Sequence, residues 1–260
     1  MYSTQLRRIA ILFILLINFI IAPSQAWARP SVVTRIRALF SGPQEIGKAR
    51  RVRQGASVRD PDLCPTTEQP LTALVPDTKE PVKTSQEYPV FWFYLPYPII
   101  SGDSSQFALK FVLQDSDHND IYQSKFTLSE TISSGIIGLR LSSQAAALEV
   151  GKTYRWYFLI YCDDPQEIYE PAFVEGLIQR EALNPNLKNK IEEAPPQERF
   201  LLYAEELLWY DTLTALVEAR EDDPENSTLI DDWSSLLQGV DFDQQITQQP
   251  IVGRYYIGDI

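Results

Sequence analysis

The sequence predicts a mainly β protein with a C-terminal α segment, in which an antiparallel β-sandwich is followed by a short helical module. Seven segments with strand character recur between residues 71 and 180, with turn residues between them and no helical period among them. Beyond residue 180 the apolar period changes from two residues to 3.6, which indicates amphipathic helices. We therefore assign residues 61–181 to the sandwich, residues 182–240 to a helical segment and residues 241–260 to a tail.

The expected strands are residues 71–75, 88–98, 106–113, 121–128, 135–141, 153–162 and 172–180. The segment 88–98, YPVFWFYLPYP, is predicted to be the central strand. Its alternation separates two apolar sets, with Phe91, Phe93 and Leu95 on one face and Val90, Trp92 and Tyr94 on the other. Because both faces are apolar, we expect this strand to be covered on both sides. The prolines near its ends have no N–H to donate to a ladder.

Residues 148–156, LEVGKTYRW, resemble the turn and following strand of fibronectin type III and related immunoglobulin-like sandwiches. In those folds a tyrosine at the start of the penultimate strand forms a hydrogen bond back across the corner. The resemblance gives this place to Tyr154 and makes Tyr154 and Trp156 a structural corner. Period-two alternation puts Phe158 and Ile160 on the same face as Trp156, which is predicted to be the core face.

Helix starts and stops are marked by Asn184-Pro185, Pro195-Pro196, Asp223-Pro224 and Asn226-Ser227. The apolar stripes between them resemble one and a half tetratricopeptide-like repeats. Because a solenoid needs about three repeats to be stable alone, we expect residues 182–240 to pack on the sandwich or on a partner. The tail has no clear period and stays unassigned.

The first 28 residues have the parts of a secretory signal peptide: a basic Arg7-Arg8 pair, an apolar run and Ala26-Trp27-Ala28. The run, residues 9–22, is shorter than the roughly 20 residues of a membrane span. We expect export to the periplasm, the cell envelope or the outside, with cleavage near Ala28. An uncleaved N-terminal anchor is the alternative.

The charged residues are unevenly distributed along the rest of the chain. Residues 29–60 form a basic segment, in which eight basic residues from Arg29 to Arg59 stand against one acid; from Asp60 onward 13 basic and 34 acidic residues give a net charge of −21. We interpret the basic segment as a flexible linker, which could tether the protein to an anionic surface or lie against its own acidic body. The acidic body argues against nucleic acid as a partner.

Cys64 and Cys162 predict one disulfide in an oxidising compartment, with two buried free thiols as the alternative. Two cysteines and the single histidine, His118, are too few for the usual four zinc ligands, so we predict no metal site. The segment 115–120 begins like a calcium loop but lacks its glycine and its last glutamate, which favours a solvated turn. The sequence has no dinucleotide or P-loop motif, and we predict no cofactor.

We predict no catalytic residues, because a nucleophile of the serine or cysteine class would depend on His118. A carboxylate pair of the glycosidase type stays open as a hydrolase alternative, with Glu87, Glu170 and Glu175 beside strands. The candidate ligand- or partner-binding residues are aromatic: Trp92, Tyr94, Tyr97, Tyr157, Trp209 and Tyr210. Exposed rings stack on sugars or bury partner side chains. We favour the other interpretation, that these rings form ordinary core and the seat of the helical segment, because Trp and Tyr are usually well buried.

Several motifs occur in a fixed order: Cys64, then LTALVP at 71–76, FWFYLPY at 91–97, LEVGKTYRW at 148–156, VEG at 174–176 with Arg180, and WYD at 209–211. Together they resemble a family of exported cyanobacterial proteins, the domain of unknown function 928. The resemblance implies no activity and no catalytic residues. We expect a non-enzymatic protein that binds another envelope protein. The alternatives are a polysaccharide-binding module using Trp92, Tyr94 or Tyr157, and a hydrolase.

Overall fold

The computed structural model describes Phe40 and residues 64–101, 107–128, 130–143, 145–162 and 171–257. The expected signal peptide and, apart from Phe40, the basic segment lie outside these residues. Phe40 is half-buried, and its ring meets the ring of Trp209 edge-on with 5.0 Å between the centroids.

The described residues form two β-sheets followed by helices. The four-stranded sheet has the order β1 (Thr72–Ala73), β3 (Val90–Leu95), β6 (Gly135–Leu141) and β9 (Ile251–Ile257). The five-stranded sheet has the order β2 (Val82–Thr84), β8 (Ala172–Arg180), β7 (Thr153–Cys162), β4 (Phe107–Gln114) and β5 (Asp120–Phe126). All seven expected strands are present, and the prediction of a mainly β chain with C-terminal helices is confirmed.

The expectation of purely antiparallel sheets is wrong at two places. The short strand β2 pairs in parallel with β8, and β9 pairs in parallel with β6. Neither β2 nor β9 was predicted, and β9 lies in the tail that the sequence left unassigned. The remaining neighbouring strands pair antiparallel.

The helices are α2 (Pro185–Glu193), α3 (Pro196–Glu205), α4 (Trp209–Asp222), α5 (Ser227–Gly239) and α6 (Gln244–Thr247). Two of the predicted helix starts are confirmed by their caps. The Asn184 side chain accepts a hydrogen bond from the backbone N–H of Asn186, and the Asn226 side chain accepts one from Thr228. In the part of the chain that the structure describes, no helix is both long and apolar enough to cross a membrane.

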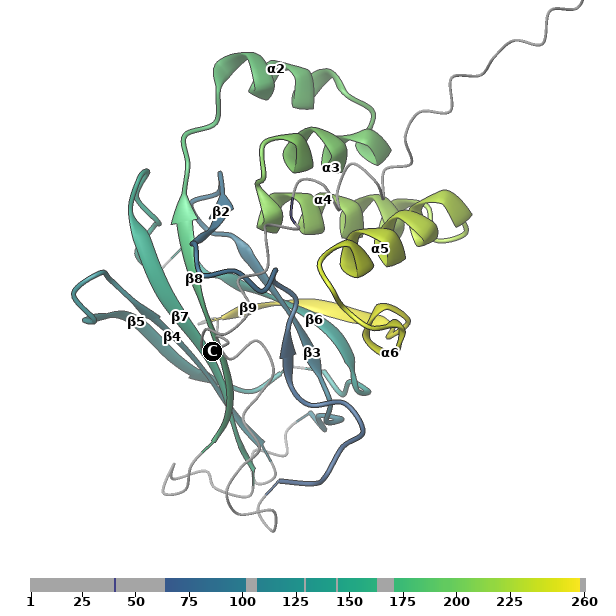
Figure 1. Ribbon diagram of the computed structural model, residues 1–260. Helices are drawn as coiled ribbons and strands as arrows, with labels where there is room; N and C mark the ends of the chain where they lie inside the picture. The colour runs from purple at the N-terminus through teal and green to yellow at the C-terminus, as the bar shows by residue number, and fades with distance from the viewer. Residues whose placement is uncertain are drawn as a thin grey trace, which may run out of the picture.

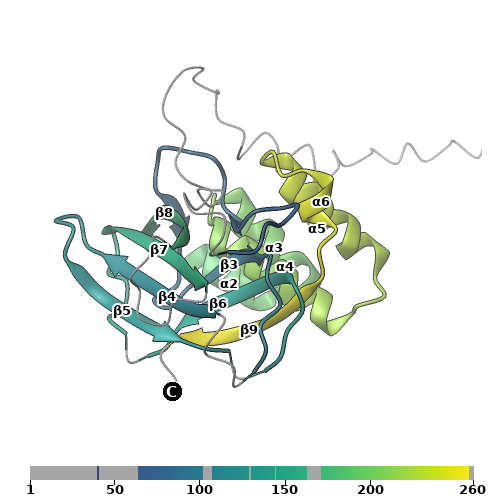
Figure 2. The ribbon, with the colours of Figure 1, turned by 90° about the horizontal axis from the view of Figure 1, so that it is seen from below.

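The two sheets lie face to face (Figures 1 and 2), and aromatic side chains pack between them. The ring centroid of Phe93 lies 4.5 Å from that of Phe158 on β7, and Phe91 lies 4.9 Å from Phe111 on β4. The opposite face of β3 is covered by α4, where the Trp92 indole N–H donates to the Thr214 hydroxyl at 3.0 Å. All six residues of β3 are buried, so the prediction of a strand covered on both sides is confirmed.

The N-terminus of α4 closes one end of the layer between the sheets. The Tyr210 ring meets Phe91 with 5.4 Å between centroids, and its hydroxyl accepts a hydrogen bond from the Trp156 indole N–H at 2.9 Å. At the other end a disulfide joins Cys64, just before β1, to Cys162, the last residue of β7. The core is therefore closed by a helix at one end and by a covalent link at the other.

Two glycines shape the surroundings of β7, one in the turn before it and one on the neighbouring strand β8. Gly151 has φ +79°, a left-handed conformation that glycine adopts without a steric penalty. At Gly176, on β8, a Cβ atom would lie 2.4 Å from the Trp156 ring, so only glycine leaves room for the indole. The Tyr154 hydroxyl accepts a hydrogen bond from the backbone N–H of Glu149 at 3.0 Å, which ties β7 back to the preceding turn.

Candidate functional site

Five of the six candidate aromatic side chains are buried: Trp92, Tyr94, Tyr97, Trp209 and Tyr210. These five rings are therefore not exposed, which agrees with the favoured interpretation that they are core and the seat of the helical segment. The physical reason is the helical segment, because α4 covers the outer face of β3. The Trp209 indole N–H also donates to the Leu74 carbonyl oxygen at 2.7 Å, which fixes α4 on the four-stranded sheet. The favoured interpretation describes Trp92, Trp209 and Tyr210.

The sixth candidate, Tyr157, is half-buried on the face of the five-stranded sheet that points away from the core. Strand register places three rows of side chains across β4, β7 and β8 on this face: Lys110, Leu159 and Phe173; Val112, Tyr157 and Glu175; Gln114, Arg155 and Leu177. We call these nine residues the outer sheet face. All are half-buried except Val112, which is buried.

The outer sheet face combines rings, aliphatic side chains and an ion pair. The rings of Tyr157 and Phe173 are tilted by 51° with 6.5 Å between centroids. The Arg155 guanidinium donates to the Glu175 carboxylate at 3.1 Å. Burial, and then the Glu175 charge, raise the pKa of Tyr157, so its hydroxyl stays protonated at neutral pH. Aromatic residues and arginine are enriched at protein–protein interfaces relative to the rest of the surface.

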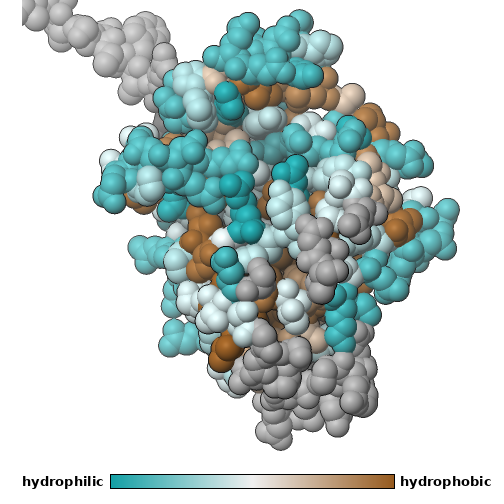
Figure 3. Space-filling model, turned by 180° about the vertical axis from the view of Figure 1, so that it is seen from behind, coloured by the Kyte–Doolittle hydropathy of each residue, from teal (hydrophilic) through white to brown (hydrophobic). Residues whose placement is uncertain are grey.

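The helices lie away from this face. They gather over the four-stranded sheet and around β2, and the strands β4, β5 and β7 stand apart from them (Figures 1 and 2). Seen from behind, the helices present mostly hydrophilic residues, with hydrophobic residues in separate patches (Figure 3). The large hydrophobic side chains that are exposed among the described residues are also scattered: Ile100, Val150, Leu207, Ile230 and Tyr256.

A buried carboxylate connects α4 to the five-stranded sheet. The Asp211 side chain is buried and accepts hydrogen bonds from the Thr84 hydroxyl at 2.7 Å, from the Gln86 amide at 3.1 Å, and from both the backbone N–H and the hydroxyl of Ser85. Burial raises the pKa of Asp211, although these hydrogen bonds act in the opposite direction. Next to them, the Arg180 guanidinium donates to the Ser85 carbonyl oxygen and to the Glu87 carboxylate at 3.1 Å. Since every oxygen of Asp211 has a protein donor, this cluster holds the helical segment in place.

The raised pKa of Asp211 predicts a pH-dependent stability. The folded protein binds the Asp211 proton more tightly than the unfolded chain, whose aspartate pKa is about 4. Stability should therefore fall as the pH rises from about 4 through the folded pKa, and level off above it. Asp211→Asn removes this titration. We expect the wild type to gain stability relative to Asp211→Asn on acidification, because the folded protein favours the protonated side chain. Urea unfolding of both proteins between pH 4 and 8 measures this difference. A difference that grew with pH would show that the carboxylate is stabilised in its charged form.

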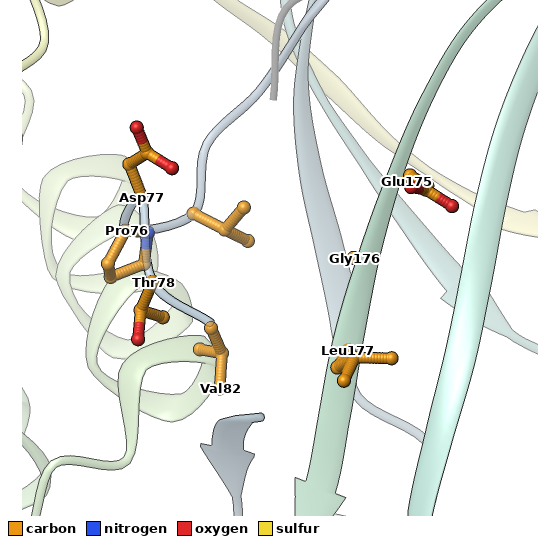
Figure 4. A pocket seen from close by; sticks show the side chains of 8 residues that line it. Pro76, Asp77, Thr78, Val82, Glu175, Gly176 and Leu177 are labelled. Carbon is orange, nitrogen blue, oxygen red and sulfur yellow. The ribbon is translucent and has the colours of Figure 1, made fainter. Parts of the chain in front are cut away.

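The acidic candidates do not form a visible pair. Glu87 and Glu175 are each bound to an arginine, and Glu170 lies outside the described residues. A cavity of about 20 Å³ lies next to β8, between the turn at residues 75–78 and Glu175 (Figure 4). That volume has room for about one water molecule. Figure 4 shows the Glu175 side chain pointing away from Asp77, so these two carboxylates do not face each other.

The segment around His118 forms an exposed hairpin turn between β4 and β5, as predicted. His118 has φ +65°, and one Asp115 carboxylate oxygen accepts the backbone N–H groups of Asp117 and Asn119, both at 2.9 Å. Hydrogen bonds from the side chain and the backbone of Asn119 hold the pKa of Asp115 below its usual value. Within the described ranges, no group of three or more histidine, cysteine or acidic side chains is arranged to hold a metal ion.

Sequence reasoning missed most of the outer sheet face. Of its nine residues only Tyr157 and Glu175 were candidates, and Leu159, Phe173 and Leu177 were not. The available signal was that β7 is apolar on both faces, with Tyr157, Leu159 and Tyr161 alternating with the core residues. This alternation does not show which of two apolar faces a distant helix covers.

The motifs noted in the sequence converge on the core and on the Asp211 cluster. Residues 51–251 match the model of a family described as Domain of Unknown Function (DUF928). No curated protein matches the chain.

Proposed function

Because the chain belongs to the DUF928 family, whose description carries no activity, we propose its function from its geometry: a non-enzymatic, exported protein that binds a partner protein through the outer sheet face. The observation that supports this proposal is the half-buried set Tyr157, Leu159, Phe173 and Leu177, which the helices leave uncovered. Surfaces of this composition gain free energy when a second protein removes them from water.

The shape of the face favours a protein over a small molecule. Small-molecule sites are concave, whereas the outer sheet face is formed by side chains of one sheet, and the cavity at its edge has room for about one water. The charged groups at its centre, Arg155 and Glu175, are paired with each other. The partner is therefore a protein with a flat apolar patch and with polar groups that meet this ion pair.

The proposal includes an immunoglobulin-like sandwich as the scaffold. Two features support it. The strand orders β1-β3-β6 and β8-β7-β4-β5, with β2 parallel to β8, fit the two sheets of such a sandwich. The Tyr154 hydroxyl is hydrogen-bonded to the turn before its own strand. A tetratricopeptide-like relation for α3 and α4 rests on their sequence pattern and on their close packing against each other.

Export to the cell envelope rests on two observations. The first 28 residues have the three parts of a signal peptide. Cys64 and Cys162 form a disulfide, the form in which cysteine pairs persist in oxidising compartments.

The test is a site-specific photo-crosslinking experiment in the producing cells. A benzophenone amino acid at Leu159 should give an adduct with one protein, and the same group at Tyr256, an exposed ring on β9, should not. With the purified pair, Tyr157→Ala should weaken binding at least about tenfold, as hot-spot truncations do. Arg155→Glu should weaken it as well, because it breaks the ion pair with Glu175 and places two carboxylates side by side on this face. Tyr256→Ala is the matched control. Equal crosslinking from Leu159 and Tyr256 would rule out this face. So would an adduct whose yield does not change with Tyr157→Ala.

A further inference from the structure

A polar groove of about 570 Å³ lies between the segment before β1, the end of β3 and the turn around α6. Its walls are formed by Thr67, Glu68, Gln69, Tyr94, Pro96, Gln245, Gln248 and Gln249. We call this site the amide groove. The groove is open to solvent and is not an enclosed cavity.

The walls of the amide groove are held in place by hydrogen bonds. The Gln69 amide donates to the side-chain oxygen of Gln245, which joins the two walls. The Gln249 amide donates to the Gln245 backbone carbonyl at 2.9 Å. Behind them, the Trp233 indole N–H donates to the Thr247 carbonyl at 3.1 Å, which fixes α6 on α5. A groove ordered before binding loses less conformational entropy when a ligand enters.

The chemistry of the lining selects a neutral ligand rich in hydroxyl groups. A glutamine amide has a carbonyl acceptor and an NH₂ donor, which is the combination that a pair of neighbouring sugar hydroxyls requires. Gln69, Gln245 and Gln249 use part of this capacity in the hydrogen bonds within the groove, and their remaining N–H groups and oxygen lone pairs can serve a ligand. The one charged lining residue is Glu68, so the groove repels anions and offers them no cation. Tyr94 and Pro96 also line the groove but are buried, so the contacts with a ligand fall to the glutamine side chains, which are exposed or half-buried.

The same lining disfavours a peptide. An extended peptide commonly binds by adding a strand to a free sheet edge, but β3 is paired on both sides at this level, with Thr72 and Ile136 opposite Tyr94. The lining also has no aliphatic pocket for peptide side chains. From these observations we propose that the amide groove binds a neutral glycan chain, with Gln248, Gln249 and Gln69 bonded to sugar hydroxyls.

The proposal is tested by calorimetric titration of the full mature chain with four neutral oligosaccharides: the hexamers of β-1,4-glucose, α-1,4-glucose, β-1,4-mannose and β-1,4-N-acetylglucosamine. At least one should bind. The double variant Gln248→Ala, Gln249→Ala should lower that affinity about tenfold or more, the effect of losing roughly 1.4 kcal/mol of hydrogen bonding. Gln244→Ala is the matched control, since Gln244 is an exposed α6 glutamine outside the lining. It should leave the affinity unchanged.

Three outcomes would overturn the proposal. The first is that none of the hexamers binds at millimolar concentration. The second is that the control variant Gln244→Ala loses as much affinity as the double variant. The third is that the hexamers do not bind, while a neutral (Ser-Thr)₅ peptide binds and loses affinity in the double variant. Thermal unfolding of each variant checks that it is folded. Tyr157→Ala should not change glycan affinity, so the groove and the outer sheet face succeed or fail separately.

Discussion

Tyr210→Ala is expected to destabilise the protein by about 3–5 kcal/mol, the cost of truncating a large core ring. Tyr210 is 2% exposed, its ring packs on Phe91 between the two sheets, and its hydroxyl accepts the Trp156 N–H. The truncation leaves a cavity at the end of the core that α4 closes. It also leaves the buried Trp156 indole N–H without an acceptor. Urea unfolding, followed by tryptophan fluorescence and circular dichroism, measures the loss.

Two matched variants separate the parts of this effect. Tyr210→Phe keeps the ring and removes the acceptor, which should cost about 1–3 kcal/mol because the Trp156 N–H stays buried. Tyr256→Ala removes a tyrosine that is 58% exposed, and should change stability by no more than about 0.5 kcal/mol. If Tyr210→Ala cost no more than Tyr256→Ala, then α4 would be an accessory to the two sheets and not part of their core.

The expected effect at Tyr210 depends on how α4 packs on the two sheets, which the sequence only partly revealed. The change of period after residue 180 indicated helices, and the small number of repeats indicated that they need a surface to pack on. The sequence did not show which surface. Trp92 and Tyr157 are both aromatic residues in strands that are apolar on both faces, yet α4 covers Trp92 and leaves Tyr157 half-buried. That choice depends on contacts across more than a hundred residues of chain.

The strands β2 and β9 were not predicted, because their local sequence patterns are weak. The strand β2 has three residues, which is too short for an alternating pattern to be recognised. The strand β9 contains Gly253 and Arg254, which interrupt its apolar pattern, and its burial is mostly partial. Both strands are held by parallel pairing with strands distant in sequence, β8 and β6. By contrast, β3 and β7 have long apolar alternations, and their positions followed from the sequence.

The candidate sites were predictable only in residue type. The sequence pointed to aromatic residues, and tyrosines do lie at both proposed sites, Tyr157 on the outer sheet face and Tyr94 in the amide groove. The side chains that give each site its chemistry were missed, because glutamines in a tail without a period have no signature of their own. Gln245, Gln248 and Gln249 face Gln69 only because α6 returns the chain to β3.

The second large effect is expected from the disulfide. Replacing Cys64 and Cys162 together by serine should destabilise the protein by about 4 kcal/mol, since the bond closes a loop over a sequence separation of 98 residues. The loss should appear as a lower urea midpoint. Wild-type protein unfolded with a reductant present is the control and should have the same midpoint as the serine variant. An unchanged midpoint in the variant would mean that the link contributes nothing to the folded state.

The position of the disulfide makes a sharper test possible. It lies at the end of the core opposite to Tyr210, and the two share no contact among the described residues. Effects at distant sites add within about 0.5 kcal/mol. Adding Tyr210→Phe to the serine variant should therefore cost the same 1–3 kcal/mol as it does in the wild type. A smaller cost would mean that loss of the disulfide already weakens the packing of Tyr210 and α4 at the other end of the core. The two sheets would then depend on both closures together, because neither sheet alone buries both faces of β3.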